Sequence, residues 1–177
     1  TCDFRQGRAL YPLHIEGNMK ENMFDVLMYL FEHYYMDDDA ELGPDRESLQ
    51  TELLEAGFPP AEISQAFEWL EGLSVQQHQT QTTQTANAIR IYADSEVDRL
   101  DAESRGFILF LEQIGILGPE ARERVIERVM ALETDDFDIT QLKWVILMVL
   151  FNQPGAEAAY AWMEDLVFES VPGGYLH

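Results

Sequence analysis

Residues Ile139–Phe151 read ITQLKWVILMVLF, and the segment Asn152-Gln153-Pro154-Gly155 follows them directly. The last eight residues of this stretch, Trp144 to Phe151, form the longest apolar run in the sequence. A helix that is apolar almost all round belongs in the middle of a domain or under a partner, and a Pro-Gly pair is a typical helix stop. We therefore predict that Ile139–Phe151 is the central helix of a C-terminal core.

Helical spacing of apolar residues continues on both sides of this run. Downstream, 156–168 is predicted as the last helix, and upstream 120–132 is predicted to bury one face. The residues of that face are Val125, Ile126, Val129, Met130 and Leu132. Further upstream, Ser95 followed by Asp98 is a variant capping box, which predicts a helix that runs to Ile114 with a bend at Gly106.

The N-terminal part of the chain shows a different order of elements. Met23–Tyr35 predicts a nearly all-apolar helix, and two shorter helices beginning at Asp45 and Pro60 are joined by a turn at 57–59. The uncharged, Gln- and Thr-rich residues 74–88 predict a loop, and Ile89–Tyr92 predicts a short strand. This order is typical of a winged helix.

These patterns predict a mostly α-helical protein with three parts. Residues 1–22 are expected to be a disordered or non-native extension, 23–93 a three-helix or winged-helix-like unit, and 94–177 a helical bundle packed beside it. Cys2 is the only cysteine, which excludes an internal disulfide. No signal peptide is visible and no apolar run approaches the roughly 20 residues of a membrane span, so we expect a cytoplasmic protein.

The strongly negative charge of the chain disfavours anionic partners such as nucleic acid and anionic membranes. The sequence holds 33 acidic and 11 Lys or Arg residues, for a net charge of -22. Binding to nucleic acid or to an anionic membrane needs cations that replace condensed counterions. The predicted recognition helix of the helix-turn-helix has no Lys or Arg and exposes Glu62, Glu68 and Glu71, so it would repel DNA. Direct nucleic-acid binding is therefore disfavoured.

The sequence contains no phosphate-binding loop, nucleophile elbow or zinc-binding motif. The four histidines are isolated, and no cofactor is expected. The acidic clusters Asp37–Glu41 and Glu133–Asp138 could hold a divalent cation, although neither matches a calcium-binding loop and solvated turns are the simpler interpretation. An enzyme with a carboxylate or metal site there stays an alternative.

A second set of polar residues, Arg99, Asp101 and Arg105, has two possible roles. The two arginines are scarce cations in an acidic chain, and Asp101 lies at i,i+4 from Arg105. One interpretation is internal ion pairing that fixes the joint between the two halves. The other is an exposed contact for an anion or a partner.

Several stretches resemble the Smg family of small acidic bacterial proteins. They include Met23–Glu32 (MFDVLMYLFE), Arg99-Leu100-Asp101 with Arg105-Gly106-Phe107, and Leu142–Pro154 (LKWVILMVLFNQP). The resemblance covers Met23 to His177 and implies a native start at Met23 and a bacterial, cytoplasmic protein. It carries no catalytic residue over to this chain.

Together these observations predict a non-enzymatic adaptor or regulatory protein whose acidic helical surface binds a basic protein partner. The residues predicted to contact that partner are Glu62, Glu68, Trp69, Arg99 and Arg105. The sequence leaves open whether the chain also forms a homo-oligomer.

Overall fold

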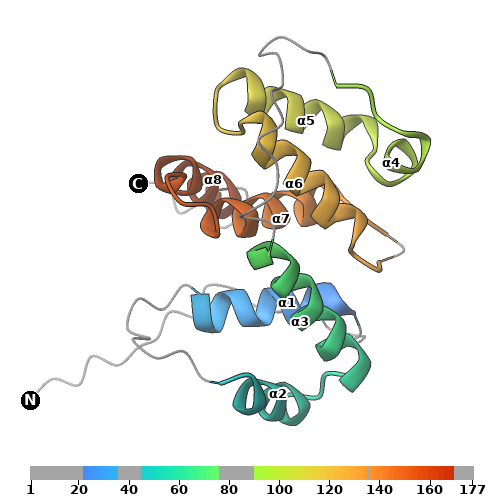
Figure 1. The fold of residues 1–177 in the computed structure, drawn as a ribbon, viewed down its shortest axis with the longest axis vertical. Coiled ribbons are helices and arrows are strands. Elements are labelled where there is room, and N and C mark those ends of the chain that lie inside the picture. The colour runs from blue at the N-terminus through green and yellow to red at the C-terminus, as the bar shows by residue number, and fades with distance from the viewer. Residues whose placement is uncertain (1–21, 36–44, 76–89, 135, 170–177) are drawn as a thin grey trace, which may run out of the picture.

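The described part of the chain is built from helices (Figure 1). The computed structural model describes residues 22–35, 45–75, 90–134 and 136–169. In chain order the helices are α1 (Met23–Leu30), the π-helical turn η1 (Phe31–Tyr35), α2 (Arg46–Glu55), α3 (Pro60–Val75), α4 (Asp94–Arg99), α5 (Ala102–Gln113), α6 (Pro119–Met130), α7 (Ile139–Phe151) and α8 (Glu157–Glu169). The predicted helical class is confirmed.

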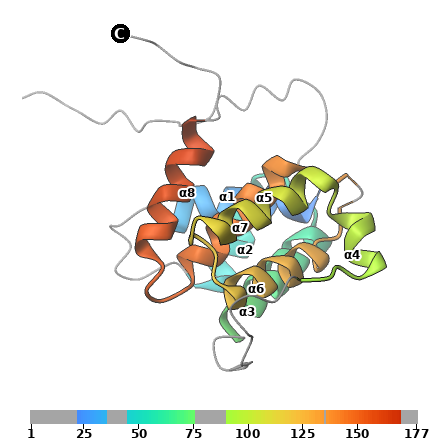
Figure 2. The same cartoon turned by 90° about the horizontal axis from the view of Figure 1, so that it is seen from above.

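The described helices form two groups. Helices α1, α2 and α3 lie together on one side, and α4 to α8 lie on the other (Figure 1). Within the second group α4 and α8 stand at opposite ends, as both views show (Figure 2). One continuous cluster of buried apolar side chains contains residues of both groups, so the segments predicted as two units share a core.

Helix α7 is the centre of that core. Leu142 and every residue from Trp144 to Leu150 are buried, against α5, α6 and α8. At its start Asp138 and Gln141 form a capping box, in which the Asp138 carboxylate accepts from the Gln141 N–H at 2.8 Å. The prediction of a central helix at Ile139–Phe151 is confirmed.

Helix α1 is covered on two sides, which explains its nearly all-apolar sequence. It packs against α3, and the Phe31 ring that follows it lies edge-on to Trp144 and Phe151 of α7, with ring centroids 6.2 and 5.6 Å apart. The turn from α2 to α3 uses Gly57 at φ +94°, a left-handed conformation that favours glycine. Phe58 follows it and is buried.

The winged-helix prediction is wrong for the described residues. No strand is present among them, and the described part of the predicted strand, residues 90–92, is extended chain. The alternation of side chains is real, but the half-buried members are Arg90 and Tyr92, while Ile91 is 89% exposed. Ion pairs to Arg90 hold this segment in place of a strand partner.

The long helix predicted from Ser95 to Ile114 is also corrected. It divides into α4 and α5 at Leu100 and Asp101, and not at Gly106. The Asp101 carboxylate caps α5 by accepting from the Ser104 N–H at 2.7 Å, so a competing cap ends the first helix. Ser95 is not a cap, because α4 begins one residue earlier with Ala93 as its N-cap.

Three further expectations concern the buried face of α6, the segments outside the described residues and membrane-spanning helices. Met130 is 37% exposed, so its predicted place in the buried face of α6 is wrong, whereas Val125, Ile126, Val129 and Leu132 are buried. Nearly all of the predicted extension and of the Gln- and Thr-rich loop lies outside the described residues. No described helix has the length and apolarity needed to cross a membrane.

Candidate functional site

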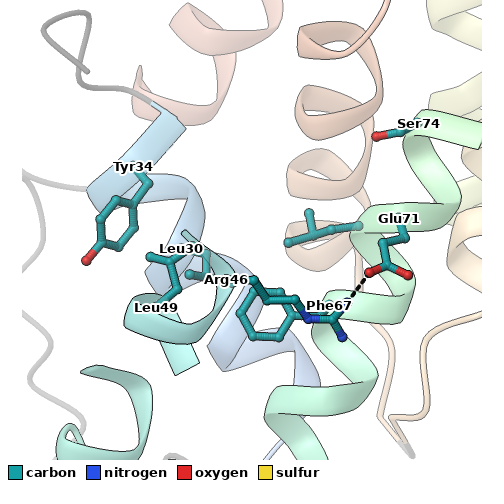
Figure 3. A pocket seen from close by; sticks show the side chains of 8 residues that line it. Leu30, Tyr34, Arg46, Leu49, Phe67, Glu71 and Ser74 are labelled. Carbon is teal, nitrogen blue, oxygen red and sulfur yellow. Dashed lines mark hydrogen bonds and ion pairs between the residues drawn. The ribbon is translucent and has the colours of Figure 1, made fainter. Parts of the chain in front are cut away.

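A pocket of about 290 Å³ opens between η1, α2 and α3 (Figure 3). Its described lining combines apolar walls with a few polar groups. The lining residues are Leu30, Tyr34, Arg46, Leu49, Phe67, Leu70, Glu71 and Ser74. An apolar hollow with a small number of polar groups at its edge is the usual form of a binding site in proteins.

Helical spacing places these side chains on one side of each helix. On α3, Phe67 is followed at +3, +4 and +7 by Leu70, Glu71 and Ser74, which share a face. Leu30 and Phe67 are also part of the buried core, with 1% and 8% of their surface exposed. The walls of the pocket are therefore fixed by the same packing that holds α1 and α3 together.

An ion pair between α2 and α3 lies at the edge of the pocket. The Arg46 guanidinium donates to the Glu71 carboxylate and lies 5.0 Å from the centre of the Phe67 ring. Both charged side chains remain more than half exposed, at 56% and 60%. An exposed pair of this kind contributes only about 0–1 kcal/mol to stability, so it can be replaced by a competing charge.

Two tyrosines connect the other side of the pocket to α2. Tyr29 donates to one oxygen of Glu52 at 3.1 Å, and Tyr34 donates to the other. Burial, together with this hydrogen bond and the nearby Glu52 charge, raises the pKa of Tyr34 to about 12. A tyrosine hydroxyl is protonated throughout the neutral range in any case, and the raised pKa extends its donation to Glu52 into alkaline solution.

The π-helical turn places Tyr34 at this position. Within it, the His33 ring stacks on Tyr29 with centroids 4.1 Å apart, and His33 Nδ1 lies 2.9 Å from the Tyr29 carbonyl oxygen. Such turns widen a helix locally and are frequent at functional sites. Here the turn lies where α1 passes into the edge of the pocket.

The surface around the pocket is strongly acidic. Residues 45–75 hold seven carboxylates and a single cation, Arg46. Among these carboxylates Glu47, Glu55 and Glu68 are exposed, and Glu62 is half-buried. The α2–α3 surface, by which we mean the exposed face of residues 45–75, therefore carries a local excess of negative charge.

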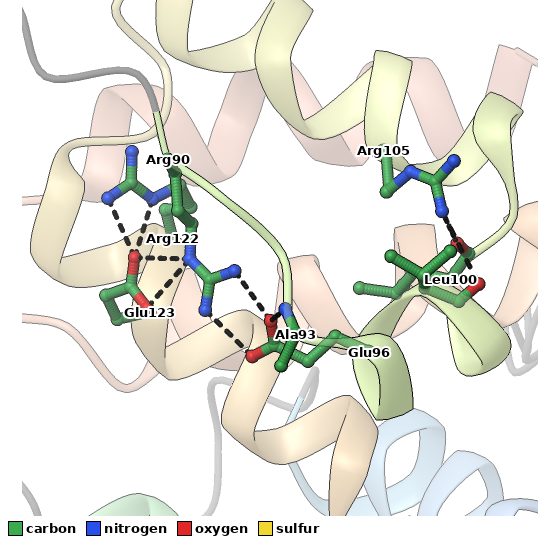
Figure 4. Close-up of polar contacts among 8 residues, drawn as sticks. Arg90, Ala93, Glu96, Leu100, Arg105, Arg122 and Glu123 are labelled. Carbon is green, nitrogen blue, oxygen red and sulfur yellow. Dashed lines mark hydrogen bonds and ion pairs between the residues drawn. The ribbon is translucent and has the colours of Figure 1, made fainter.

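Arg90, Arg105 and Arg122 are held by internal carboxylate or carbonyl oxygens (Figure 4). Arg90 makes a two-pronged contact with Glu96, with both N–O distances at 2.8 Å, and also donates to Glu123. Arg122 bonds Glu112 at 2.6 Å and the same Glu123. Hydrogen bonds from Arg90 lower the pKa of Glu96 to about 2. This network attaches the extended segment before α4 to α6.

A second internal contact joins α3 to α6. The Trp69 indole donates to the Arg128 carbonyl at 2.8 Å, and the Arg128 guanidinium donates to the Trp69 carbonyl at 3.2 Å. That guanidinium lies over Gly72, where an added Cβ would be 1.9 Å from its Nη1 atom. Glycine is thus the residue that lets the arginine cross the helix at this point.

Comparison with known proteins gives a consistent family assignment. Residues 23–177 match a family model described as "Protein of unknown function (DUF494)". The Smg homolog of Alkalilimnicola ehrlichii is 58% identical over 152 residues, which cover 86% of this chain and 96% of that protein. The Smg homolog of Thioalkalivibrio sulfidiphilus is 56% identical over 160 residues, which cover 90% of this chain and 100% of that protein.

The chain belongs to the Smg family. A further relative, the Smg homolog of Nitrosococcus oceani, is 59% identical over 155 residues, covering 86% of this chain and 97% of its own. No solved structure matches the chain. The matched region contains every lining residue of the pocket that lies in the described part of the chain.

In this Smg family member the five residues predicted to contact a partner are dispersed. Trp69 is 3% exposed and lies inside the joint between α3 and α6. Arg99 donates to the carbonyls of Leu132 and Thr134. These two side chains have internal partners, so the binding role predicted for them stays untested and our proposal does not depend on it.

Arg105 and the two glutamates are placed differently. Arg105 donates to the Leu100 carbonyl at 2.8 Å (Figure 4), and the Asp101 carboxylate caps α5. The contacts described for this set are internal, as one interpretation expected, but they are bonds to backbone groups within α4 to α8 and not ion pairs across the joint between the two groups of helices. Glu62 and Glu68 lie on the α2–α3 surface. Their binding role stays a prediction, and it agrees with the charge found there.

The acidic turns of the metal alternative are only partly described. Asp37–Glu41 lies outside the described residues. In the second turn Glu133 accepts from Gln65 at 2.8 Å and Asp138 caps α7. Among the described residues no cluster of three or more metal-binding side chains is found.

Sequence reasoning missed the pocket itself. Phe67 and Leu70 lie at helical spacing on α3 and pack on the core, so their pattern alone indicates a buried face and gives no sign that they line a pocket. The signal that points to an edge is the charged pair Arg46 and Glu71, since each lies at helical spacing from an apolar lining residue. Pairing them requires knowing how α2 packs on α3.

Proposed function

We propose that this protein is a non-enzymatic adaptor or regulatory protein that binds a basic protein partner through its α2–α3 surface. The observation that carries the proposal is the unbalanced charge of that surface, where seven carboxylates face one cation. Complementary charge speeds the encounter of two proteins and selects the orientation in which they meet.

The internal use of arginine supports the same proposal. Arg90, Arg99, Arg105, Arg122 and Arg128 each bind carboxylate or carbonyl oxygens of the chain itself. Because these cations are committed to holding the fold, they do not neutralise the acidic surface. The same charge repels a nucleic-acid backbone, which favours a protein as the partner.

The test is affinity capture from a nuclease-treated lysate of the native host with matched variants of the full chain. One variant neutralises the α2–α3 surface with Glu47→Gln, Glu55→Gln and Glu68→Gln. The control removes the same number of exposed carboxylates on α4, α5 and α8 with Asp98→Asn, Glu103→Gln and Asp165→Asn.

We expect a stoichiometric basic protein to be retained by the wild type and by the control and to be lost from the α2–α3 variant. Equal retention by both variants would place the contact elsewhere. If no stoichiometric protein is retained by the wild type at low or moderate salt, the adaptor proposal is wrong.

A further inference from the structure

We propose that the pocket between η1, α2 and α3 receives one large apolar side chain from a basic segment of the partner, and that a cation beside that side chain replaces Arg46 on Glu71. This inference rests on the proposed function, because it names the anchor by which the acidic surface selects its partner. It assigns separate roles to the walls and to the edge of the pocket.

The size of the pocket fits a single side chain. A volume of about 290 Å³ lies at the lower end of the roughly 300–1,000 Å³ range of sites for drug-sized molecules. Protein interfaces commonly depend on a few aromatic or aliphatic side chains inserted into such hollows. The buried walls, Leu30 and Phe67, are part of the core, so the hollow needs little reorganisation to accept an anchor.

The charge at the edge of the pocket determines which residues of the partner can lie beside the inserted apolar side chain. Arg46 is the only cation among the described lining residues, and it is already paired with Glu71. A phosphate or carboxylate ligand would approach a surface whose net charge is negative. A lysine or arginine of the partner would instead meet Glu71 and the exposed carboxylates of α2 and α3.

Exchange of one cation for another is feasible at this position. Both members of the Arg46–Glu71 pair are more than half exposed, and such pairs are weak. Movement of Arg46 away from Glu71 would also free the face of Phe67, over which its guanidinium now lies. An incoming apolar side chain would then gain contact with that ring.

The experiment is a titration of the ¹⁵N-labelled full chain, followed by NMR, with synthetic pentapeptides as probes. The first probe is Lys-Arg-Trp-Arg-Lys, the second replaces Trp by Ala, and the third is Glu-Asp-Trp-Asp-Glu. Free indole is the fourth probe. We expect the first peptide to shift the amide signals of Leu49, Leu70 and Ser74 and to bind roughly tenfold or more tightly than its alanine version.

Matched variants separate the pocket from the charge. Ser74→Phe places a ring at the edge of the pocket and should abolish the advantage of the Trp peptide, whereas Ser64→Phe, at another exposed serine of α3, should preserve it. Arg46→Gln removes the internal competitor and should tighten binding several-fold. Glu71→Gln should weaken it by a similar factor.

Each contrary result overturns the inference in a recognisable way. Equal binding of the Trp and Ala peptides would show a charged surface without an anchor pocket, and the proposed function would stand. Equal binding of free indole would indicate a site for small neutral molecules. Equal binding of the acidic peptide would show that the charge at the edge of the pocket does not select a cationic segment. Binding of none of the probes would reject the pocket as an anchor site, while the capture experiment would still decide the proposed function.

Discussion

At Gly72 of α3 there is no room for a side chain, because the Arg128 guanidinium of α6 lies directly over the backbone. A Cβ there would meet the Nη1 atom of Arg128 at 1.9 Å and its Cζ atom at 2.8 Å. The guanidinium is the end of a long side chain, but it is buried and hydrogen-bonded to Trp69. Moving it would break that bond.

We therefore predict that Gly72→Ala is less stable than Gly106→Ala by about 1–3 kcal/mol. Both glycines lie inside helices, so alanine gains the same helix propensity of about 0.5–1 kcal/mol at each. At Gly106 nothing lies within 4 Å of the added Cβ. Urea denaturation of the two variants checks the difference, and equal stabilities would show that Arg128 moves aside without cost.

Glu96 gives a prediction about acid stability. Arg90 lowers its pKa from 4.5 to about 2 in the folded protein, so the stabilisation is present above pH 4.5 and is lost as the pH falls toward 2. Glu96→Gln should cost about 1–3 kcal/mol at neutral pH, and its difference from the wild type should shrink below about pH 4.5.

The exposed Asp98 on the same helix supplies the control. Asp98→Asn should change stability by less than about 0.5 kcal/mol. Urea denaturation measured from neutral to acid pH distinguishes the two variants. A Glu96→Gln effect that is independent of pH would mean that the ion pair with Arg90 does not carry the stabilisation.

At the level of elements, the division between α4 and α5 depends on one cap. Asp101→Ala removes the carboxylate that accepts from the Ser104 N–H and should cost about 0.5–2 kcal/mol. Ser95→Ala, at the residue that the sequence pattern proposes as a cap, should stay within about 0.5 kcal/mol of the wild type. If Ser95→Ala were instead less stable than Asp101→Ala, a single helix capped at Ser95 would describe this segment better than two helices.

Local patterns predict most elements of this fold and few of its contacts. The apolar run at 144–151 and the start at Pro60 correctly indicate α7 and α3. The strand predicted from Ile89 to Tyr92 fails because alternation alone does not say which face is buried. Here Arg90 is held by Glu96 of the following helix and by Glu123 of α6, and the second partner comes within reach only when this segment packs on α6.

The pocket was beyond sequence reasoning for a similar reason. Its lining comes from three helical segments that are separate in the chain, and the relative positions of α1, α2 and α3 determine whether a hollow remains between them. The acidic character of the α2–α3 surface, in contrast, follows directly from composition, because residues 45–75 hold seven carboxylates and one cation.

For the whole molecule, a net charge of -22 predicts that salt stabilises the fold. Raising ionic strength from about 0.01 M to about 0.15 M shortens the screening length from roughly 30 to 8 Å and reduces repulsion between carboxylates. The melting temperature should rise by about 2–4 °C for each kcal/mol of repulsion removed.

Calorimetry at the two salt concentrations provides the measurement. The control variant with Asp98→Asn, Glu103→Gln and Asp165→Asn should melt higher than the wild type at low salt and respond less to added salt. A melting temperature that falls with salt would show that internal ion pairs outweigh the repulsion of the surface.

The central claim, that the α2–α3 surface is where a basic partner binds, is tested most directly by site-specific photo-crosslinking in the native host. A photoreactive amino acid replaces Gln50, an exposed residue one helical turn from Arg46, and in a separate protein replaces Gln113, an exposed glutamine at the end of α5. We expect one basic protein to be crosslinked from position 50 and to be absent from the products of position 113. The same products from both positions, or a product from position 113 alone, would contradict it.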